Sequence, residues 1–304
     1  MLESPPITSE PVVLETSTGR LYGTVDLPRS AAPFPVALLI AGSGPTDRDG
    51  NSAALPGANN SLKLLAQGLA TQGIASVRYD KRGIAESAKA GTSETDLRFD
   101  TYVDDAVRWG KQLREDKRFS KLVVIGHSEG ALIGTVATQK MQADAFISIA
   151  GAGRPAPQLI LDQVKGKLPP DLQRQTERVL QRLTEGKTTG EVPAPLAALF
   201  RPSVQPYLIS WFRYDPAQEI AKITVPTLVV QGTTDVQVST EEAKLLAKAK
   251  PAAKLLIVEG MNHVLKEVPL DNAQQVKSYR DATLPVAPQL LRELGVFIKQ
   301  PVGN

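Results

Sequence analysis

Cysteine is absent from this chain of 304 residues, and histidine occurs only twice, at His127 and His263. Without cysteine the protein has no disulfide bond, no thiolate nucleophile and no cysteine-ligated zinc site. Two histidines are too few for a site with several histidine ligands, so the sequence predicts no metal centre. Any chemistry that needs an imidazole must therefore use one of these two residues.

An excess of one charge and a long apolar run are also lacking. The chain has 35 Lys and Arg residues against 32 Asp and Glu residues, a formal net charge of +3. It has no dense basic cluster interleaved with aromatic residues, so we expect no nucleic-acid partner. No apolar stretch approaches the roughly 20 residues that span a bilayer, so no transmembrane segment is expected. We therefore expect a soluble protein. Residues 1–13 lack the basic and apolar regions of a signal peptide, so we expect it to be cytoplasmic, or exported if a signal peptide has been removed.

Short apolar runs alternate with amphipathic helical patterns along most of the chain. The runs are nearly continuous, as in parallel strands covered on both faces, and they comprise residues 36–40, 74–79, 122–125, 145–150, 227–230 and 254–258. Helical stripes include residues 61–73, 99–107 and 290–298, and residues 11–28 have the pattern of a two-stranded hairpin. The sequence predicts an α/β fold with a mostly parallel central sheet flanked by helices.

The alternation is interrupted after the sixth strand. Residues 154–222 are rich in proline and mostly helical in pattern, which predicts a helical cap inserted into a core of residues 1–153 and 223–304. The cap contains many of the few aromatic residues of the chain. Either these rings line a substrate pocket, with Phe200, Tyr207, Trp211 and Phe212 as the candidates, or they form the core of the cap together with Tyr214.

The stretch GHSEG places Ser128 between Gly126 and Gly130. A strand-like run precedes it and a small-residue helix pattern follows it, as in the sharp turn that exposes a nucleophilic serine. A serine at its free pKa needs a general base. His127 adjoins the serine within the turn, which leaves His263, in the loop after the last apolar run, as the candidate base.

A carboxylate is needed to orient the base, and Asp235 follows the preceding strand. The chain order of Ser128, Asp235 and His263 is the one expected of a serine hydrolase built on a parallel sheet. Glu259 and Asp271 are poorer candidates because no strand end directs them. The oxyanion hole is expected to use the backbone N–H of Glu129 and that of Ser43 in the glycine-rich loop after the third strand.

The loop GSGPTDRDGN (residues 42–51), together with YDKRG (residues 79–83) and GHSEG, resembles the α/β-hydrolase superfamily. The resemblance is to bacterial esterases related to the prolyl-oligopeptidase and dienelactone-hydrolase branches, and it covers residues 11–300 except the cap. It implies hydrolysis of a carboxylic ester, less often an amide, without a cofactor. In YDKRG, Asp80 and Arg82 are interpreted as holding a loop. IAGSG replaces the family's frequent HG, which leaves the second oxyanion donor open.

The expected reaction is acyl-enzyme hydrolysis of a small-molecule ester. Because a cap limits the length of a covered pocket, short to medium acyl chains are expected. A peptidase or amidase, a thioesterase or an acyltransferase would use the same three residues, and a non-catalytic binding protein would keep the fold alone. The sequence does not separate these classes or specify the oligomeric state.

Two other motifs predict competing sites. DRDGNS (residues 47–52) begins like a calcium loop, but its glycine is misplaced and no closing glutamate follows. GAGRPA (residues 151–156) has dinucleotide-binding spacing, but it does not open a first βαβ unit and it contains Pro155. Neither motif is expected to bind a ligand.

Overall fold

The structure, a computed structural model, describes residues 7–91, 93–190 and 192–301. Eight strands form a sheet in the order β1-β2-β4-β3-β5-β6-β7-β8. Their bounds are β1 Thr8–Thr16, β2 Gly19–Leu27, β3 Phe34–Ile40, β4 Ala75–Tyr79, β5 Phe119–His127, β6 Ala145–Ile149, β7 Thr227–Gly232 and β8 Lys254–Val258. Each predicted strand is present, and the hairpin predicted at the amino terminus is formed by β1 and β2.

The sheet is parallel from β4 through β8, whereas the hairpin joins its edge by antiparallel pairing of β2 with β4. Every residue of β4, β6 and β7 is buried. This burial explains why those strands are mostly apolar in sequence rather than alternating, because a parallel strand is covered on both faces. The prediction of a mostly parallel α/β sheet is confirmed.

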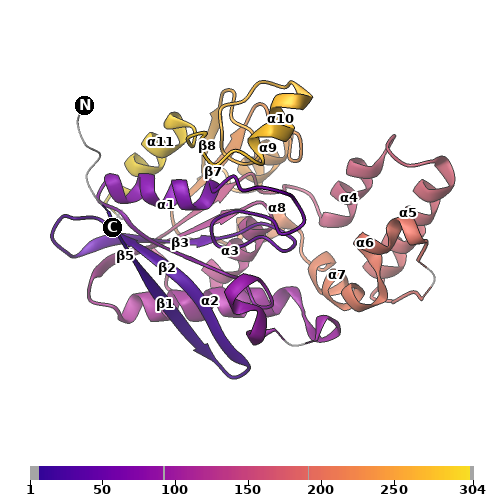
Figure 1. The fold of residues 1–304 in the computed structure, drawn as a ribbon, viewed down its shortest axis with the longest axis horizontal. Helices are drawn as coiled ribbons and strands as arrows, with labels where there is room; N and C mark the ends of the chain where they lie inside the picture. Colours follow the sequence, from indigo (N-terminus) through magenta and orange to yellow (C-terminus); the bar gives the residue numbers. More distant parts are fainter. Residues whose placement is uncertain (1–6, 92, 191, 302–304) are drawn as a thin grey trace.

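Helices cover both faces of the sheet (Figure 1). On one face, α1 (Ser61–Thr71) and α11 (Pro288–Lys299) pack against strand residues such as Leu39. On the other, α2 (Phe99–Glu115), α3 (Glu129–Lys140) and α9 (Thr240–Ala249) pack against residues such as Leu38. Leu38 and Leu39 belong to different cores because successive side chains of a strand point to opposite faces.

The segment after β6 forms a group of helices at one end of the molecule (Figure 1). They are α4 (Ala156–Val164), α5 (Pro170–Thr184), α6 (Ala197–Phe200) and α7 (Gln205–Phe212). The next helix, α8 (Pro216–Ala221), packs against α3 and α9, and α7 contacts α2. The remaining short helices are η1 (Ala85–Ala90), η2 (Glu94–Asp96), η3 (Ala194–Leu196), η4 (Pro202–Val204) and α10 (Asn272–Ser278).

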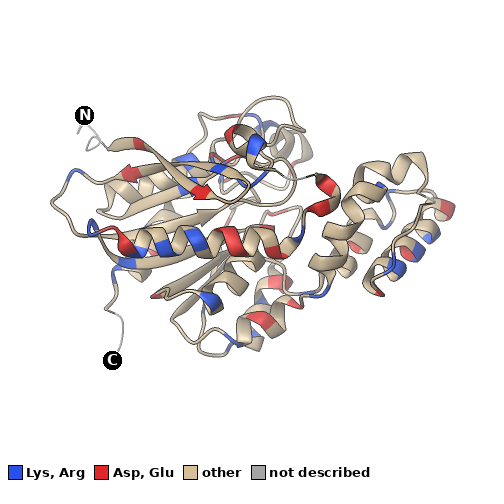
Figure 2. Ribbon diagram, turned by 90° about the horizontal axis from the view of Figure 1, so that it is seen from below, with Lys and Arg blue, Asp and Glu red and all other residues tan. Residues whose placement is uncertain are grey.

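Charged residues of both signs are interspersed along the helices and loops in Figure 2. Among the described residues, no helix combines the length and the apolar character needed to cross a membrane.

Candidate active site

Ser128 lies in the turn between the end of β5 and the start of α3. Its backbone has φ 57° and ψ −122°, a conformation that non-glycine residues rarely adopt. Two hydrogen bonds hold this turn: the Ser128 N–H donates to Ile149 O at 2.9 Å, and Ser128 O accepts from the Ala131 N–H at 2.9 Å. The turn therefore fixes the serine at the carboxyl end of the central strands.

The two glycines around Ser128 allow backbone segments to pass very close to one another. A Cβ on Gly126 would lie 2.1 Å from Gly130 O, and a Cβ on Gly130 would lie 2.2 Å from Ile40 O. Both distances are far below van der Waals contact, so neither position has room for a side chain. The spacing of GHSEG is thus a packing requirement of β3, β5 and α3.

His263 and Asp235 are brought together by the ends of β8 and β7. His263 Nδ1 lies 2.8 Å from Asp235 Oδ2, with side chains 7% and 1% exposed. Asp235 Oδ1 accepts the N–H groups of Gln237 and Val238 at 2.8 and 2.9 Å, and Oδ2 accepts from Gln231 Nε2 at 2.9 Å. Burial acts to raise the pKa of Asp235, but the charge and hydrogen bond of His263 and the two backbone donors outweigh it, so the pKa lies below its ordinary value.

The loop that carries His263 is held in place by contacts of the residues just before His263. Asn262 Nδ2 donates to Ser278 Oγ at 2.8 Å, and Asn262 Oδ1 accepts from the Lys266 N–H at 3.0 Å. A Cβ on Gly232 would lie 1.9 Å from Met261 O, so this loop approaches β7 only because position 232 is glycine. These contacts fix the position of the loop, and with it that of His263, near the carboxyl end of β7.

His127, which the sequence analysis set aside as a base, supports the other histidine. Its Nε2 lies 2.8 Å from His263 O, and because a carbonyl only accepts, Nε2 carries the proton. Burial first, and then the charge of His263, lower the pKa of His127 to about 3. His127 is therefore neutral and acts as a donor that holds the His263 backbone.

Ser128 and His263 line one cavity of about 170 Å³. Among the described residues, His263 forms its side-chain hydrogen bond with Asp235, and no hydrogen bond joins the Ser128 hydroxyl to His263. The lining also includes Gly42, Ser43, Thr46, Gly50, Ser52, Leu55, Asn59, Ser61, His127, Gln237, Val264 and Tyr279. Of the two expected oxyanion donors, Ser43 is in this lining, and Glu129 is the first residue of α3, so its N–H has no partner within the helix.

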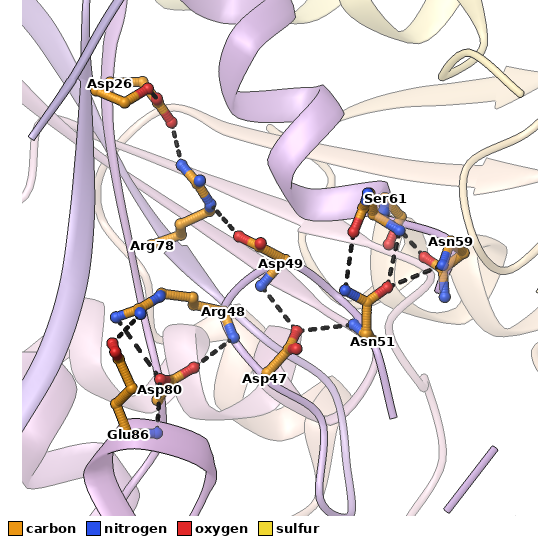
Figure 3. Close-up of polar contacts among 12 residues, drawn as sticks. Asp26, Asp47, Arg48, Asp49, Asn51, Asn59, Ser61, Arg78, Asp80 and Glu86 are labelled. Carbon is orange, nitrogen blue, oxygen red and sulfur yellow. Dashed lines mark hydrogen bonds and ion pairs between the residues drawn. The ribbon is translucent and has the colours of Figure 1, made fainter. Parts of the chain in front are cut away.

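The acidic residues of DRDGNS stabilise the loop after β3 (Figure 3). Asp47 Oδ1 accepts the N–H groups of Asp49 and Asn51, both at 2.9 Å, while Asp49 Oδ1 accepts from Arg78 Nε at 2.7 Å. Asn51 Oδ1 accepts the Asn59 N–H at 2.8 Å. These carboxylates and amides are therefore used to fold the loop that forms one wall of the cavity.

The second competing motif, GAGRPA, is occupied by a carboxylate of the protein itself. Glu242 Oε2 accepts the N–H groups of Gly153 and Arg154 at 2.9 and 3.0 Å, and Glu242 Oε1 accepts from Arg154 Nε at 2.7 Å. The backbone donors that would cradle a phosphate in a dinucleotide site already have this internal anion.

In YDKRG, Asp80 and Arg82 hold loops, as interpreted from the sequence. Asp80 Oδ1 accepts the Arg48 N–H at 2.8 Å, and Arg82 pairs with Asp105 at 2.6 Å. Lys81, which the sequence analysis did not single out, is buried with Glu129 beside the Ser128 turn. The only signal that could have drawn attention to it was a lysine following an apolar strand.

Aromatic residues of the inserted segment, namely Tyr207, Trp211 and Tyr214, pack against α2. Trp211 stacks on Phe99 with ring centroids 6.4 Å apart and planes 4° from parallel, and the Tyr207 and Tyr102 rings lie 5.8 Å apart. Among the described residues that line the 170 Å³ cavity, we find none of the four candidates for the substrate pocket, Phe200, Tyr207, Trp211 and Phe212. Tyr207 still reaches the site, because its hydroxyl donates to Glu129 Oε1 at 2.6 Å.

Known proteins resemble this chain in sequence and in fold. Over 248 residues the chain is 30% identical to Esterase EstD of Thermotoga maritima, a match that covers 81% of this chain and spans 58% of the length of that relative. Est1E from Butyrivibrio proteoclasticus superposes with a TM-score of 0.60 at 14% identity, covering 95% of this chain and 98% of its own. The α/β hydrolase GrgF from a Penicillium species has a TM-score of 0.60 at 20% identity, covering 96% and 98%.

The two structural matches show that the sheet and its helices form an α/β-hydrolase fold. The profile of the family described as serine aminopeptidase, S33, matches residues 58–267, which include Ser128, Asp235 and His263. Because this match covers well over half of the chain, the protein belongs to that α/β-hydrolase family.

Proposed function

We propose that this protein is a serine esterase that hydrolyses small carboxylic esters with short to medium acyl chains. The observation that carries the proposal is the arrangement at one cavity: Ser128 on its strained turn, and His263 oriented by Asp235 at 2.8 Å. This is the constellation of a serine nucleophile, its general base and the carboxylate that orients the base.

The reaction proceeds through an acyl-enzyme. Ser128 Oγ attacks the ester carbonyl carbon while His263 Nε2 takes its proton, and Asp235 holds the Nδ1–H of the imidazole. The Ser43 and Glu129 N–H groups donate to the oxyanion. The intermediate collapses, His263 protonates the departing alcohol, and a water molecule deprotonated by His263 then releases the carboxylic acid. No cofactor takes part in these steps.

The lining of the cavity supports an ester over a peptide substrate. An aminopeptidase must bind the free ammonium group of its substrate, for which a carboxylate is the usual partner. Among the described residues that line the cavity there is no Asp or Glu. The sequence relative is named as an esterase, which supports the same choice, whereas the family description makes an aminopeptidase the alternative.

The volume of the cavity supports a short acyl group. A volume of about 170 Å³ is below the roughly 300 to 1,000 Å³ of most ligand pockets, so it suits a small acyl group. The cap, residues 154–222 inserted into a core of residues 1–153 and 223–304, reaches the neighbourhood of this space through Tyr207 of α7, whose hydroxyl donates to Glu129. In this proposal Trp211 packs between the cap and α2, and Phe200 and Phe212 are buried away from the cavity lining.

A substrate panel with Ser128→Ala tests the function. We expect the wild-type protein to hydrolyse p-nitrophenyl acetate and butyrate much faster than aminoacyl and prolyl p-nitroanilides or thioesters. Ser128→Ala should lower kcat by about 10⁶-fold, because the nucleophile is lost. Circular dichroism checks that the variant is folded. Faster turnover of the anilides would favour the peptidase, and a Ser128→Ala variant with near-normal turnover would refute the assignment.

A further inference from the structure

A buried lysine lies against the proposed oxyanion hole. Lys81 follows β4, and its side chain is 1% exposed. Its ammonium donates to Gly42 O at 2.5 Å and to Glu129 Oε2 at 3.2 Å, and it sits 4.9 Å from the centre of the Tyr102 ring. A lysine ammonium has three N–H donors and is costly to bury unpaired, so these contacts with oxygens and an aromatic face stabilise it.

Both acceptors of Lys81 belong to the segments that supply the expected oxyanion donors. Gly42 precedes Ser43, and its backbone is beside the nucleophile, because a Cβ at this position would lie 3.1 Å from Ser128 Cβ. Glu129 follows Ser128 and begins α3. One ammonium therefore joins the loop after β3 to the first residue of the helix behind the serine.

The contact with Gly42 determines the direction of the Ser43 N–H. Gly42 C=O and Ser43 N–H are parts of one peptide unit, and in a planar trans peptide they point in opposite directions. Holding the oxygen on Lys81 therefore directs the N–H away from the lysine. Withdrawal of electron density by the ammonium also makes this N–H a stronger donor.

The loop needs such a restraint because its own sequence is flexible. Glycine lies on both sides of Ser43, and Gly44 has φ +67°, in the region that glycine enters without strain. On the other side of Ser43, Thr46 Oγ1 donates to Ser43 O at 2.7 Å. The peptide units before and after Ser43 are thus each held by a donor to their carbonyl.

We propose that Lys81 is a positioning residue of the oxyanion hole, acting through the Gly42 carbonyl to orient and polarise the Ser43 N–H. This inference rests on the proposed hydrolysis at Ser128. A purely structural role would instead consist of neutralising the buried Glu129 carboxylate, whose other oxygen accepts from Tyr207. The two roles predict different values of kcat when the charges of Lys81 and Glu129 are removed together.

The test uses Lys81→Met and the double variant Lys81→Met/Glu129→Gln, assayed with p-nitrophenyl butyrate. The single variant leaves Glu129 buried without its cation and is expected to be less stable; the double variant leaves no unpaired charge and is expected to fold. In both, we expect kcat to fall by about 10² to 10³-fold, as when an oxyanion donor is removed, while KM changes by less than about threefold. Active sites are counted with a fluorophosphonate.

A trifluoromethyl ketone that forms a tetrahedral adduct with the serine provides a second measurement. Its inhibition constant should rise by the same factor as kcat falls, because the adduct places an oxyanion in the hole. Lys81→Arg, which keeps a charged donor, should recover most of the loss. Lys250→Met is the matched control, since it removes a lysine that donates to Ile223 O at 2.6 Å, before the start of β7 and thus at the opposite end of the sheet.

The inference is overturned if the double variant has the kcat and the inhibition constant of the wild type, because Lys81 would then serve only to neutralise Glu129. It is also overturned if Lys250→Met loses as much kcat as Lys81→Met. A wild-type protein that hydrolyses no ester, or is not labelled at Ser128 by the fluorophosphonate, would instead refute the proposed function itself.

Discussion

Individual residues at the site are restrained on several sides at once. Ser128 keeps φ 57° because hydrogen bonds to Ile149 and Ala131 and the close passage of Gly130 against β3 leave no relaxed alternative. Asp235 has a hydrogen-bond donor on each oxygen. Restraint of this kind lets a side chain reach its reactive geometry without loss of entropy during the reaction.

Asp235 is the residue at which the carboxylate assignment is tested. We expect Asp235→Asn to lower kcat by about 10⁴-fold, because an amide no longer stabilises the protonated imidazole and favours the wrong tautomer of His263. Asp271→Asn is the matched control, because Asp271 caps α10 by accepting the Gln274 N–H at 3.0 Å, which asparagine also does. Steady-state hydrolysis of p-nitrophenyl butyrate measures both. A larger loss in Asp271→Asn than in Asp235→Asn would show that the carboxylate is misassigned.

His127 predicts how the free energy of unfolding depends on pH. In the folded protein its pKa is lowered to about 3, foremost by burial, whereas histidine in an unfolded chain titrates near about pH 6.5. Between these values the unfolded state binds more protons than the folded state. The contribution of neutral His127 to the free energy of unfolding is therefore fully present above about pH 6.5. It falls as the pH falls, by up to about 1.4 kcal/mol per pH unit.

Replacing His127 should therefore flatten this dependence. We expect urea unfolding of His127→Gln to show a shallower decline than the wild type between about pH 7 and about pH 4. Glutamine keeps an N–H donor for His263 O, so the loop retains its contact. Parallel curves for the two proteins would show that His127 does not contribute to acid sensitivity.

At the scale of elements, the connection from β5 to α3 depends on how closely backbones approach. Gly126 and Gly130 let the first turn of α3 lie against the end of β3, and Gly232 does the same for the loop before His263. The strand ends and the helix start are then near enough for residues from the connections after β3, β5, β7 and β8 to share one cavity.

Gly130→Ala should disrupt this connection. The new Cβ would lie 2.2 Å from Ile40 O, and because the obstacle is backbone, relief requires moving α3 from the sheet. We expect a loss of about 3 kcal/mol or more in the free energy of unfolding. Gly190→Ala is the matched control, since among the described residues none lies within 4 Å of the Cβ it would gain. Equal denaturation midpoints for the two variants would contradict this account of the motif.

At the scale of the whole molecule, the sheet brings the residues of the candidate site together along one edge. In a parallel sheet all carboxyl ends lie on the same side, so the loops after successive strands converge there. These loops contribute Ser43 after β3, Lys81 after β4, Ser128 after β5, Asp235 after β7 and His263 after β8. The inserted helices follow β6 and reach the same edge through Tyr207.

The cavity at this edge predicts the acyl-chain preference. Leu55 lies in its lining and is 44% exposed, so a larger side chain fits without entering the core. We expect Leu55→Trp to narrow the space and lower the ratio of kcat/KM for butyrate over acetate esters by up to about tenfold, since each buried methylene is worth about 0.8 kcal/mol.

Trp211→Ala provides the comparison, because Trp211 packs on Phe99 outside the cavity lining. We expect this variant to change kcat/KM for acetate, butyrate and octanoate esters by one common factor. If Trp211→Ala shifts the ratio and Leu55→Trp does not, the aromatic residues of the inserted segment form the acyl pocket after all.

Local patterns were enough to predict the strands, several of the helices between them along the chain, and the turn at Ser128. The runs at residues 122–125 and 227–230 became β5 and β7, because continuous apolar strands and glycine-flanked turns are encoded by neighbouring residues. His263 and Asp235 could be singled out by scarcity and by their places after strands. The scarcity of histidine did as much as any motif to narrow the site.

Only the tertiary structure decided which distant residues meet. Lys81 contacts Gly42, 39 positions away, and Glu129, 48 positions away, and nothing in the local sequence of any of the three predicts the contact. Likewise, an aromatic stripe has the same spacing whether it faces a pocket or, as here, the side of α2. Sequence spacing specifies which face of an element is apolar, whereas the partner of that face is set by how the whole chain packs.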